Sequence, residues 1–148
     1  MHESVILDAS VLIALEKINL LQILCKLYKE IILPEGVIAE FGNVNIECYS
    51  KRKIKSKLIK VLTQDLNLGR GEAEVIALAY ESGANVLIDD LKARKIAEDF
   101  GLTVSGTIGL LLKAEKTGLI SSAFEKVKEL KEMGFYVSNE LLNKMAKI

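Results

Sequence analysis

Short apolar runs alternate with longer amphipathic stretches along most of the chain. Continuous apolar runs are typical of parallel strands covered on both faces, and helices repeat their apolar positions every three to four residues. Strands are predicted at 4–7, 31–33, 85–88 and 102–105, with a weaker one in 44–49. Helices are predicted at 9–17, 19–29, 34–41, 54–66, 70–82, 91–101 and 106–118.

This alternation of strands and helices predicts a three-layer α/β/α sandwich with a mostly parallel sheet and right-handed crossovers. Two last helices, with Ser121 and Ser138 as expected N-caps, have no strand between them. We expect them to form a helical appendage over about residues 121–148. The chain has 148 residues without a repeat or a linker, so a single domain over 1–148 is predicted.

Composition removes several classes of function. Lys and Arg together number 20, as do Asp and Glu, so no global charge attracts nucleic acid or an anionic membrane. No apolar run is long enough to span a bilayer. Cys25 and Cys48 have no CxxC spacing and no signal peptide precedes them, which favours reduced cysteines in the cytoplasm. His2 is the only histidine, so carboxylates must carry any enzymatic chemistry.

Acidic residues stand where predicted strands and helices meet. Asp8 follows the first strand directly, and Asp89 and Asp90 follow the strand "VLI". Glu40 ends the helix after the second strand, and Glu72 opens the long Ala-rich helix. The carboxyl ends of parallel strands share one edge and lie about 4.8 Å apart, so these oxygens can share a metal ion. An all-carboxylate set with no histidine fits Mg²⁺ or Mn²⁺.

Structural roles would explain some of these acids equally well. Asp8 could cap the helix that follows it, and Glu72 could complement the dipole of its own helix. Glu40 could simply lie on the solvent-exposed face of its helix, and the same role fits Glu74 better still. The adjacent pair of aspartates is harder to explain in this way, because a helix cap needs one carboxylate and two like charges repel.

Three stretches resemble the motifs of PIN-domain nucleases. "VILDASVLI" resembles their opening, "hhhD-T/N/S-S", and "VIAE" resembles their second acidic position on a helix. "LGRGEAEVIALAYESGANVLIDD" is similar to their central block, in which an acid opens an Ala-rich helix and "T-x-D" ends the next strand. "GTIGLLLKAEKTGLI" and "GFYVSNELL" resemble a prokaryotic PIN subfamily of about this length, so the resemblance covers nearly the whole chain.

The resemblance assigns roles to individual residues. It implies that the catalytic residues are Asp8, Glu40, Glu72 and Asp90. It implies that the metal ligands are Asp8, Glu72, Asp89 and Asp90. Glu74 fits the third acidic position less well than Glu72 does. Two departures from the family pattern are Glu72 where an aspartate is usual and Ile88 where the threonine of "T-x-D" is usual.

Two hydroxyl residues are expected to support these acids. Ser10 matches the small polar residue of the opening motif, and Thr107 lies in "GTIG". Gly106 and Gly109 of that segment could make a turn that cradles phosphate, but glycines more often permit close packing. We expect the packing role.

The family likeness implies hydrolysis of phosphodiester bonds by a Mg²⁺- or Mn²⁺-dependent endoribonuclease. It further implies a toxin of a toxin–antitoxin pair, with an antitoxin protein as partner and a homodimer as a common assembly. A non-catalytic module that binds nucleic acid or regulates it is the alternative, and the two departures favour it. A mononucleotide-binding protein is disfavoured, because GxGxxG and P-loop motifs are absent.

Basic residues offer contacts for a nucleic-acid backbone. "KRKIKSKLIK" holds six basic residues in ten, and Lys51, Arg52 and Lys53 could bind phosphates. A solvated helix face with the apolar residues inward is an equal alternative. Arg94 and Lys95 are closer in sequence to the acids and are also predicted phosphate contacts. The chain has few aromatic residues and no Trp, so extended base stacking is not expected.

Overall fold

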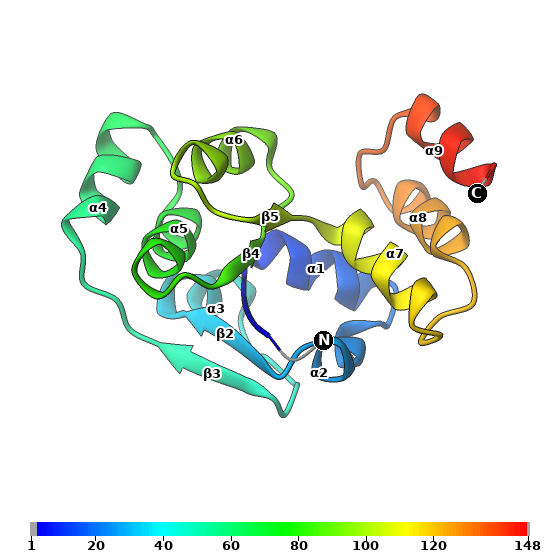
Figure 1. The fold of residues 1–148 in the computed structure, drawn as a ribbon, viewed down its shortest axis with the longest axis horizontal. Coiled ribbons are helices and arrows are strands. Elements are labelled where there is room, and N and C mark those ends of the chain that lie inside the picture. Colours follow the sequence, from blue (N-terminus) through cyan, green and yellow to red (C-terminus); the bar gives the residue numbers. More distant parts are fainter. Residues whose placement is uncertain (1–2, 148) are drawn as a thin grey trace.

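A computed structural model describes residues 3–147 and contains a five-stranded parallel sheet (Figure 1). The strand order is β3-β2-β1-β4-β5, so the first strand lies in the centre. The strands are β1 (Ser4–Leu7), β2 (Glu30–Pro34), β3 (Tyr49–Arg52), β4 (Asn85–Leu87) and β5 (Val104–Ser105). Every neighbouring pair is parallel, which confirms the predicted sheet. His2 lies outside the described residues.

Helices cover both sides of this sheet, with α5 and α6 on one side and α1 and α7 on the other (Figure 1). This confirms the predicted three-layer α/β/α architecture. The α-helices are α1 (Ala9–Lys17), α2 (Leu24–Leu27), α3 (Glu35–Phe41), α4 (Lys57–Lys60), α5 (Arg70–Ser82), α6 (Leu91–Asp99), α7 (Thr107–Lys116), α8 (Ala123–Glu132) and α9 (Asn139–Ala146). A 3₁₀ turn, η1 (Leu21–Ile23), precedes α2, and a π-helical turn, η2 (Val61–Asp65), follows α4.

The core explains why β1 reads as an unbroken apolar run. Val5, Ile6 and Leu7 are all buried, because helices pack on both faces of the central strand. Helix α5 contacts the sheet, and its buried alanines allow the two backbones to approach closely. No helix among residues 3–147 is long and apolar enough to cross a membrane.

The third strand begins at the last residue of the predicted segment 44–49 and continues beyond it to Arg52. Val44 and Ile46 bury their side chains without joining the sheet, and β3 begins at Tyr49. The apolar pattern marked the buried residues correctly, but an edge strand needs fewer buried positions than a central one. Lys51 and Arg52 therefore lie on an edge strand and not on a helix face.

Two predicted helices are interrupted. Segment 19–29 is divided between η1 and α2, and segment 54–66 between α4 and η2. Pro34, expected at the first helical position, is the last residue of β2 and the N-cap residue of α3.

The two cysteines form a disulfide, so the expectation of reduced thiols is wrong. Cys25 and Cys48 are 23 residues apart in sequence, yet their Cα atoms are 5.6 Å apart because β2 brings α2 next to the start of β3. Disulfides persist in oxidising surroundings. The disulfide therefore removes the reason for expecting a cytoplasmic location from the cysteines.

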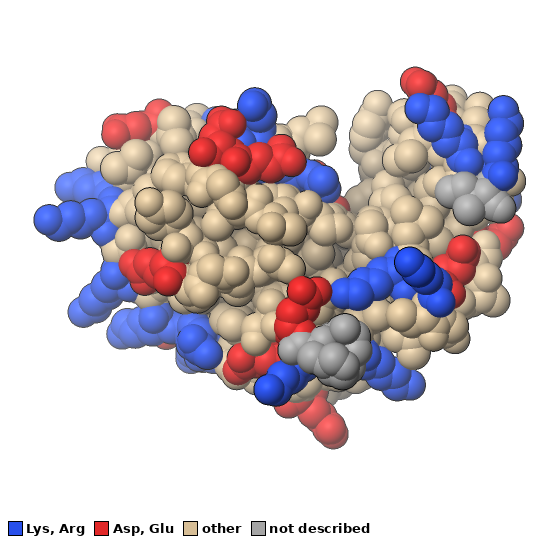
Figure 2. Space-filling model, in the orientation of Figure 1, with Lys and Arg blue, Asp and Glu red and all other residues tan. Residues whose placement is uncertain are grey.

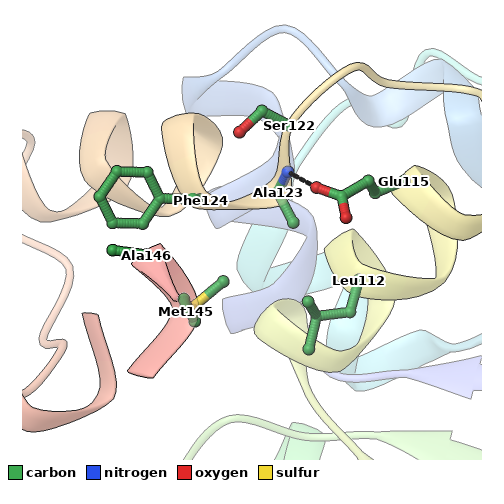
Figure 3. A pocket seen from close by; sticks show the side chains of 7 residues that line it. All are labelled: Leu112, Glu115, Ser122, Ala123, Phe124, Met145 and Ala146. Atoms are coloured by element: carbon green, nitrogen blue, oxygen red, sulfur yellow. Dashed lines mark hydrogen bonds between the residues drawn. The ribbon is translucent and has the colours of Figure 1, made fainter. Parts of the chain in front are cut away.

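The C-terminal helices pack outward from the sheet, with α8 on α7 and α9 on α8. Figure 3 shows Glu115 of α7 reaching the start of α8, where its Oε1 accepts a hydrogen bond from the Ala123 backbone N–H at 2.7 Å. The N-cap of α8 is Ser122, one residue after the predicted Ser121, and Ser138 caps α9 as predicted. The buried Met145 side chain attaches α9 to this layer.

Candidate active site at the carboxyl edge of the sheet

Asp8 is fixed where the two central strands end. Its backbone N–H donates to the carbonyl of Leu87 at 3.0 Å, which extends the pairing of β1 with β4 by one residue. The residue is 4% exposed, and Ser10 Oγ donates to its Oδ2 at 3.0 Å. Asp8 occupies the N-cap position of α1, but its side chain makes no capping hydrogen bond. The capping role considered from the sequence is therefore wrong.

The surroundings of Asp8 favour its neutral form. Burial is the main cause that raises the pKa of this carboxyl above its usual value, while the Ser10 hydroxyl and a backbone N–H act in the opposite direction. The nearby charges of Glu40 and Asp89 raise the pKa further. Such a carboxylate is costly to keep ionised unless a cation compensates it.

Glu72 belongs to the same group of acids. It is the third residue of α5, and its Oε1 accepts a long 3.3 Å hydrogen bond from the Gly69 backbone N–H. Burial raises its pKa first, followed by the charge of Asp8 and then by those of Asp90 and Glu40, while the Gly69 bond lowers it. Glu72 therefore helps to cap α5, but this hydrogen bond does not offset the rise in its pKa that burial and the other acids cause.

Glu40 approaches the group from α3. A Cβ placed on Gly71 would lie 3.5 Å from Glu40 Oε1 and 3.6 Å from the Gly36 carbonyl. The missing side chain at Gly71 thus lets α3 and α5 pack closely just before Glu72. Glu40 itself is exposed, in agreement with the solvated-face alternative, although its charge reaches both Asp8 and Glu72.

Asp89 and Asp90 have separate structural partners. Asp90 Oδ2 accepts from the Ala93 backbone N–H at 2.9 Å and caps α6. Asp89 uses both oxygens on Thr107, accepting from its backbone N–H at 2.7 Å and from its Oγ1 at 2.6 Å. The adjacent pair therefore has a structural explanation that the sequence did not suggest. Thr107 supports Asp89 and fixes the start of α7 to the end of β4.

Glu74 is buried, so the solvated-face expectation for it is wrong. It is 7% exposed, its Oε1 accepts from the Gly36 backbone N–H at 2.7 Å, and its Oε2 accepts from Arg70 Nε at 2.7 Å. The residue joins α3 to α5. The available sequence signal was its apolar surroundings, "AEVIALA", because a solvated glutamate does not fit between buried neighbours on a helix.

The predicted phosphate contacts lie in two separate places. Lys51, Arg52 and Lys53 are on or just after β3, and Figure 2 shows basic residues gathered over β3 and α4. Lys51 approaches Glu35 at 3.9 Å and Arg52 approaches Glu30 at 3.8 Å. These long, exposed ion pairs contribute little and leave the cations accessible.

The second place is α6, beside the acids. Arg94 Nη1 donates to the Ile88 carbonyl at 3.3 Å, whereas Lys95 pairs with Asp99 at 3.1 Å. A Cβ on Gly106 would lie 2.6 Å from both Arg94 Nη1 and Asp89 Oδ1, so this glycine is required for close packing. This supports the packing role for Gly106.

The donor chemistry of these acids fits a hard divalent cation, because every available ligand is a carboxylate oxygen. The side chains of residues 3–147 do not, however, bring three or more such ligands into a metal-holding arrangement. Asp8 and Glu72 are the best-placed pair, because both are partly or fully buried and the charge of Asp8 raises the pKa of Glu72. Asp89 is committed to Thr107, so Glu40 and Asp90 are better placed than Asp89 to add oxygens.

The parallel sheet and the acids at its carboxyl edge define an α/β protein with a candidate hydrolytic site. The chain belongs to the PIN-domain family: a family model described as "PIN domain" matches residues 4–148. Members of this family are typically metal-dependent nucleases. A comparison with proteins of curated function finds no match.

Proposed function

We propose that this protein is a Mg²⁺- or Mn²⁺-dependent endoribonuclease with Asp8 and Glu72 as its principal metal ligands. The observation that carries the proposal is the buried Asp8, whose pKa is raised by burial and by the charges of neighbouring acids. An asparagine would fill the same space without that cost. A cation-binding role explains why a carboxylate stands there.

The chain's own residues prepare the site for hydrolysis. The backbone bond to Leu87 and the hydroxyl of Ser10 hold the Asp8 carboxylate in one orientation. Glu40 and Asp90 supply further oxygens from α3 and from the start of α6. A divalent cation held there supplies stabilisation of the negative charge that develops on the phosphate during hydrolysis. The two hydrogen bonds from Thr107 to Asp89 fix the start of α7 to the end of β4, beside the acids.

RNA as substrate, and a role as the toxin of a toxin–antitoxin pair with an antitoxin as partner, rest on the family resemblance. The exposed basic residues of β3 and the segment after it support binding to a phosphate backbone. The toxin role has its own test. Expression of the wild-type protein should arrest growth, expression of Asp8→Asn should not, and a co-expressed antitoxin should restore growth.

Asp8→Asn tests the nuclease role directly. The change keeps size and the ability to accept from Ser10 but removes the charge, so metal-dependent cleavage of RNA should be lost. RNA affinity should be retained or should rise, because a negative charge near the phosphate is gone. Asp65→Asn, at an exposed acid in η2, is the matched control and should cleave like the wild type.

A non-catalytic nucleic-acid-binding module is the second candidate, and the absence of a three-ligand arrangement within residues 3–147 favours it. It predicts RNA binding that weakens with salt but no metal-dependent cleavage of varied RNAs by the wild type. That result would refute the nuclease role. Cleavage by Asp8→Asn equal to the wild type would refute the assignment of the site.

A further inference from the structure

A groove opens next to the acids, between the start of α6 and the segment that leads into α9. Figure 2 shows it as a notch between α6 and the C-terminal helices. Its volume is about 660 Å³, within the usual range for a small-ligand site. Ser10, Asp89 and Asp90 line it, so the groove is continuous with the carboxyl edge of the sheet.

The outer walls of this groove are unusually apolar for a surface. Leu91, on the α6 wall, is 79% exposed, and Tyr136, on the opposite wall, is 84% exposed. They are the two most exposed large apolar side chains among residues 3–147, and both line this one groove. Exposed apolar side chains that gather in a groove, unlike ones scattered singly, indicate a binding surface.

One cationic side chain enters the same space. Arg94 is half-buried, and its hydrogen bond to the Ile88 carbonyl holds the guanidinium against the groove. No other lysine or arginine lines this groove in the part of the chain that the structure describes. The groove therefore combines an accessible aromatic ring, an aliphatic wall, one fixed cation and an edge of carboxylates.

We infer that this groove binds one unpaired nucleobase of a single-stranded RNA, stacked on the ring of Tyr136. The inference rests on the proposed function and adds the form of substrate to it. Base stacking on an aromatic ring tolerates any sequence, because every base has a π-face. Arg94 complements the phosphate next to that base, and the adjoining phosphate reaches the acids because the groove and the acid edge share Asp90.

Duplex RNA does not fit this arrangement. A paired base would have to leave its helix to enter the groove, at the cost of its pairing and stacking. Within residues 3–147, Tyr136 is the one exposed aromatic ring that lines the groove, since Phe135 is half-buried. The site therefore holds a single base and not a run of stacked bases, in agreement with the low aromatic content of the chain.

The test uses a short single-stranded RNA in which one base is replaced by fluorescent 2-aminopurine. Titration of the full-length protein, once with Ca²⁺ and once with chelator, should quench the fluorescence as the base stacks. Tyr136→Ala should weaken binding by roughly tenfold and abolish the quenching, and Tyr136→Phe should restore both. Tyr80→Ala, at an exposed tyrosine on α5 outside the groove, is the matched control and should bind like the wild type.

An RNA of the same length with an abasic site tests whether the ring contacts a base. This RNA should bind roughly tenfold more weakly to the wild type, and Tyr136→Ala should weaken it no further, because the two changes remove the same contact. Duplex RNA of the same sequence should show no dependence on Tyr136.

Several results would overturn the inference. One is binding of single strands by Tyr136→Ala equal to the wild type under both conditions, and another is no binding by the wild type under either. If Tyr136→Ala sediments with a different mass but binds RNA with unchanged affinity, the groove forms contacts between copies of the chain and does not bind RNA. The readout is independent of cleavage: ring-dependent quenching without metal-dependent hydrolysis supports the groove and refutes the nuclease role. Cleavage of single-stranded RNA that depends on Asp8 but is unchanged in Tyr136→Ala supports the nuclease role and refutes the groove.

Discussion

Two buried acids, Glu74 on α5 and Asp8 at the end of β1, show how differently the fold treats a carboxylate. Glu74 is enclosed by partners: the Gly36 backbone N–H and the Arg70 guanidinium each approach one of its oxygens at 2.7 Å. Asp8 is similarly buried, but it has the Ser10 hydroxyl on one oxygen and acidic neighbours whose charges raise its pKa.

The contrast teaches that burial alone does not mark a functional acid. Burial with matched donors gives a structural acid, which holds two helices together. Burial with like charges and too few donors leaves a carboxylate that needs an external cation, and the PIN-domain family is one that generally uses divalent metals. Three predictions, given in order of decreasing effect, separate the two kinds of acid, and a fourth on the disulfide provides a comparison for stability.

The largest effect concerns catalysis. Asp8→Asn should lower metal-dependent RNA cleavage by about a thousandfold, equivalent to roughly 4 kcal/mol of transition-state stabilisation. Glu74→Gln should retain most of the activity, because Glu74 contacts α3 and Arg70 and not the other acids of the edge. Rates measured with Mg²⁺ on one RNA, with folding checked by circular dichroism, compare them. Equal loss in both variants would contradict the distinction.

The disulfide between Cys25 and Cys48 should stabilise the whole fold without acting on either acid in particular. Replacing Cys25 and Cys48 with serine should lower the free energy of unfolding by roughly 3 kcal/mol, because the unfolded chain regains the freedom of a long loop. Urea titration measures this, and cleavage by the folded variant should stay near that of the wild type. Unchanged stability would show that the tether contributes nothing in solution.

The structural acid should matter more for stability than the proposed catalytic one. Glu74→Met should lower the free energy of unfolding by about 2 kcal/mol, because the buried Gly36 N–H loses its acceptor. Asp8→Asn should leave it unchanged or raise it without metal, since self-repulsion among the acids decreases. Urea midpoints in chelator compare the two, and a larger loss for Asp8→Asn would reverse our assignment of roles.

The smallest effect is a pH dependence. Because the folded pKa of Asp8 is raised above 3.8, its favourable contribution is present at low pH and is lost as pH rises through the folded pKa. The stability advantage of Asp8→Asn over the wild type should therefore grow from pH 4 to pH 7 in chelator. Adding Mg²⁺ at pH 7 should stabilise the wild type and leave the variant unchanged. A difference that does not vary with pH would contradict the raised pKa.

The acids of the site were readable from the sequence to different degrees. Asp8 and Glu72 follow from local pattern, because one ends an apolar strand and the other opens an Ala-rich helix. Glu74 was misjudged, since its partner is Gly36, 38 residues away. Local spacing also did not show that Thr107, 18 residues away, would occupy both oxygens of Asp89. Local spacing shows where a carboxylate stands but not which donor reaches it.

The alternating elements, the parallel sheet and the strand that ends at Asp8 could all be predicted from the amino-acid sequence. These depend on the period of apolar positions, which neighbouring residues set. Three other features became visible only in the folded chain: the start of the edge strand β3, the contact of Cys25 with Cys48, and the shared groove of Leu91 and Tyr136. Each of these joins residues far apart in the chain, and such contacts form only when helices and strands pack.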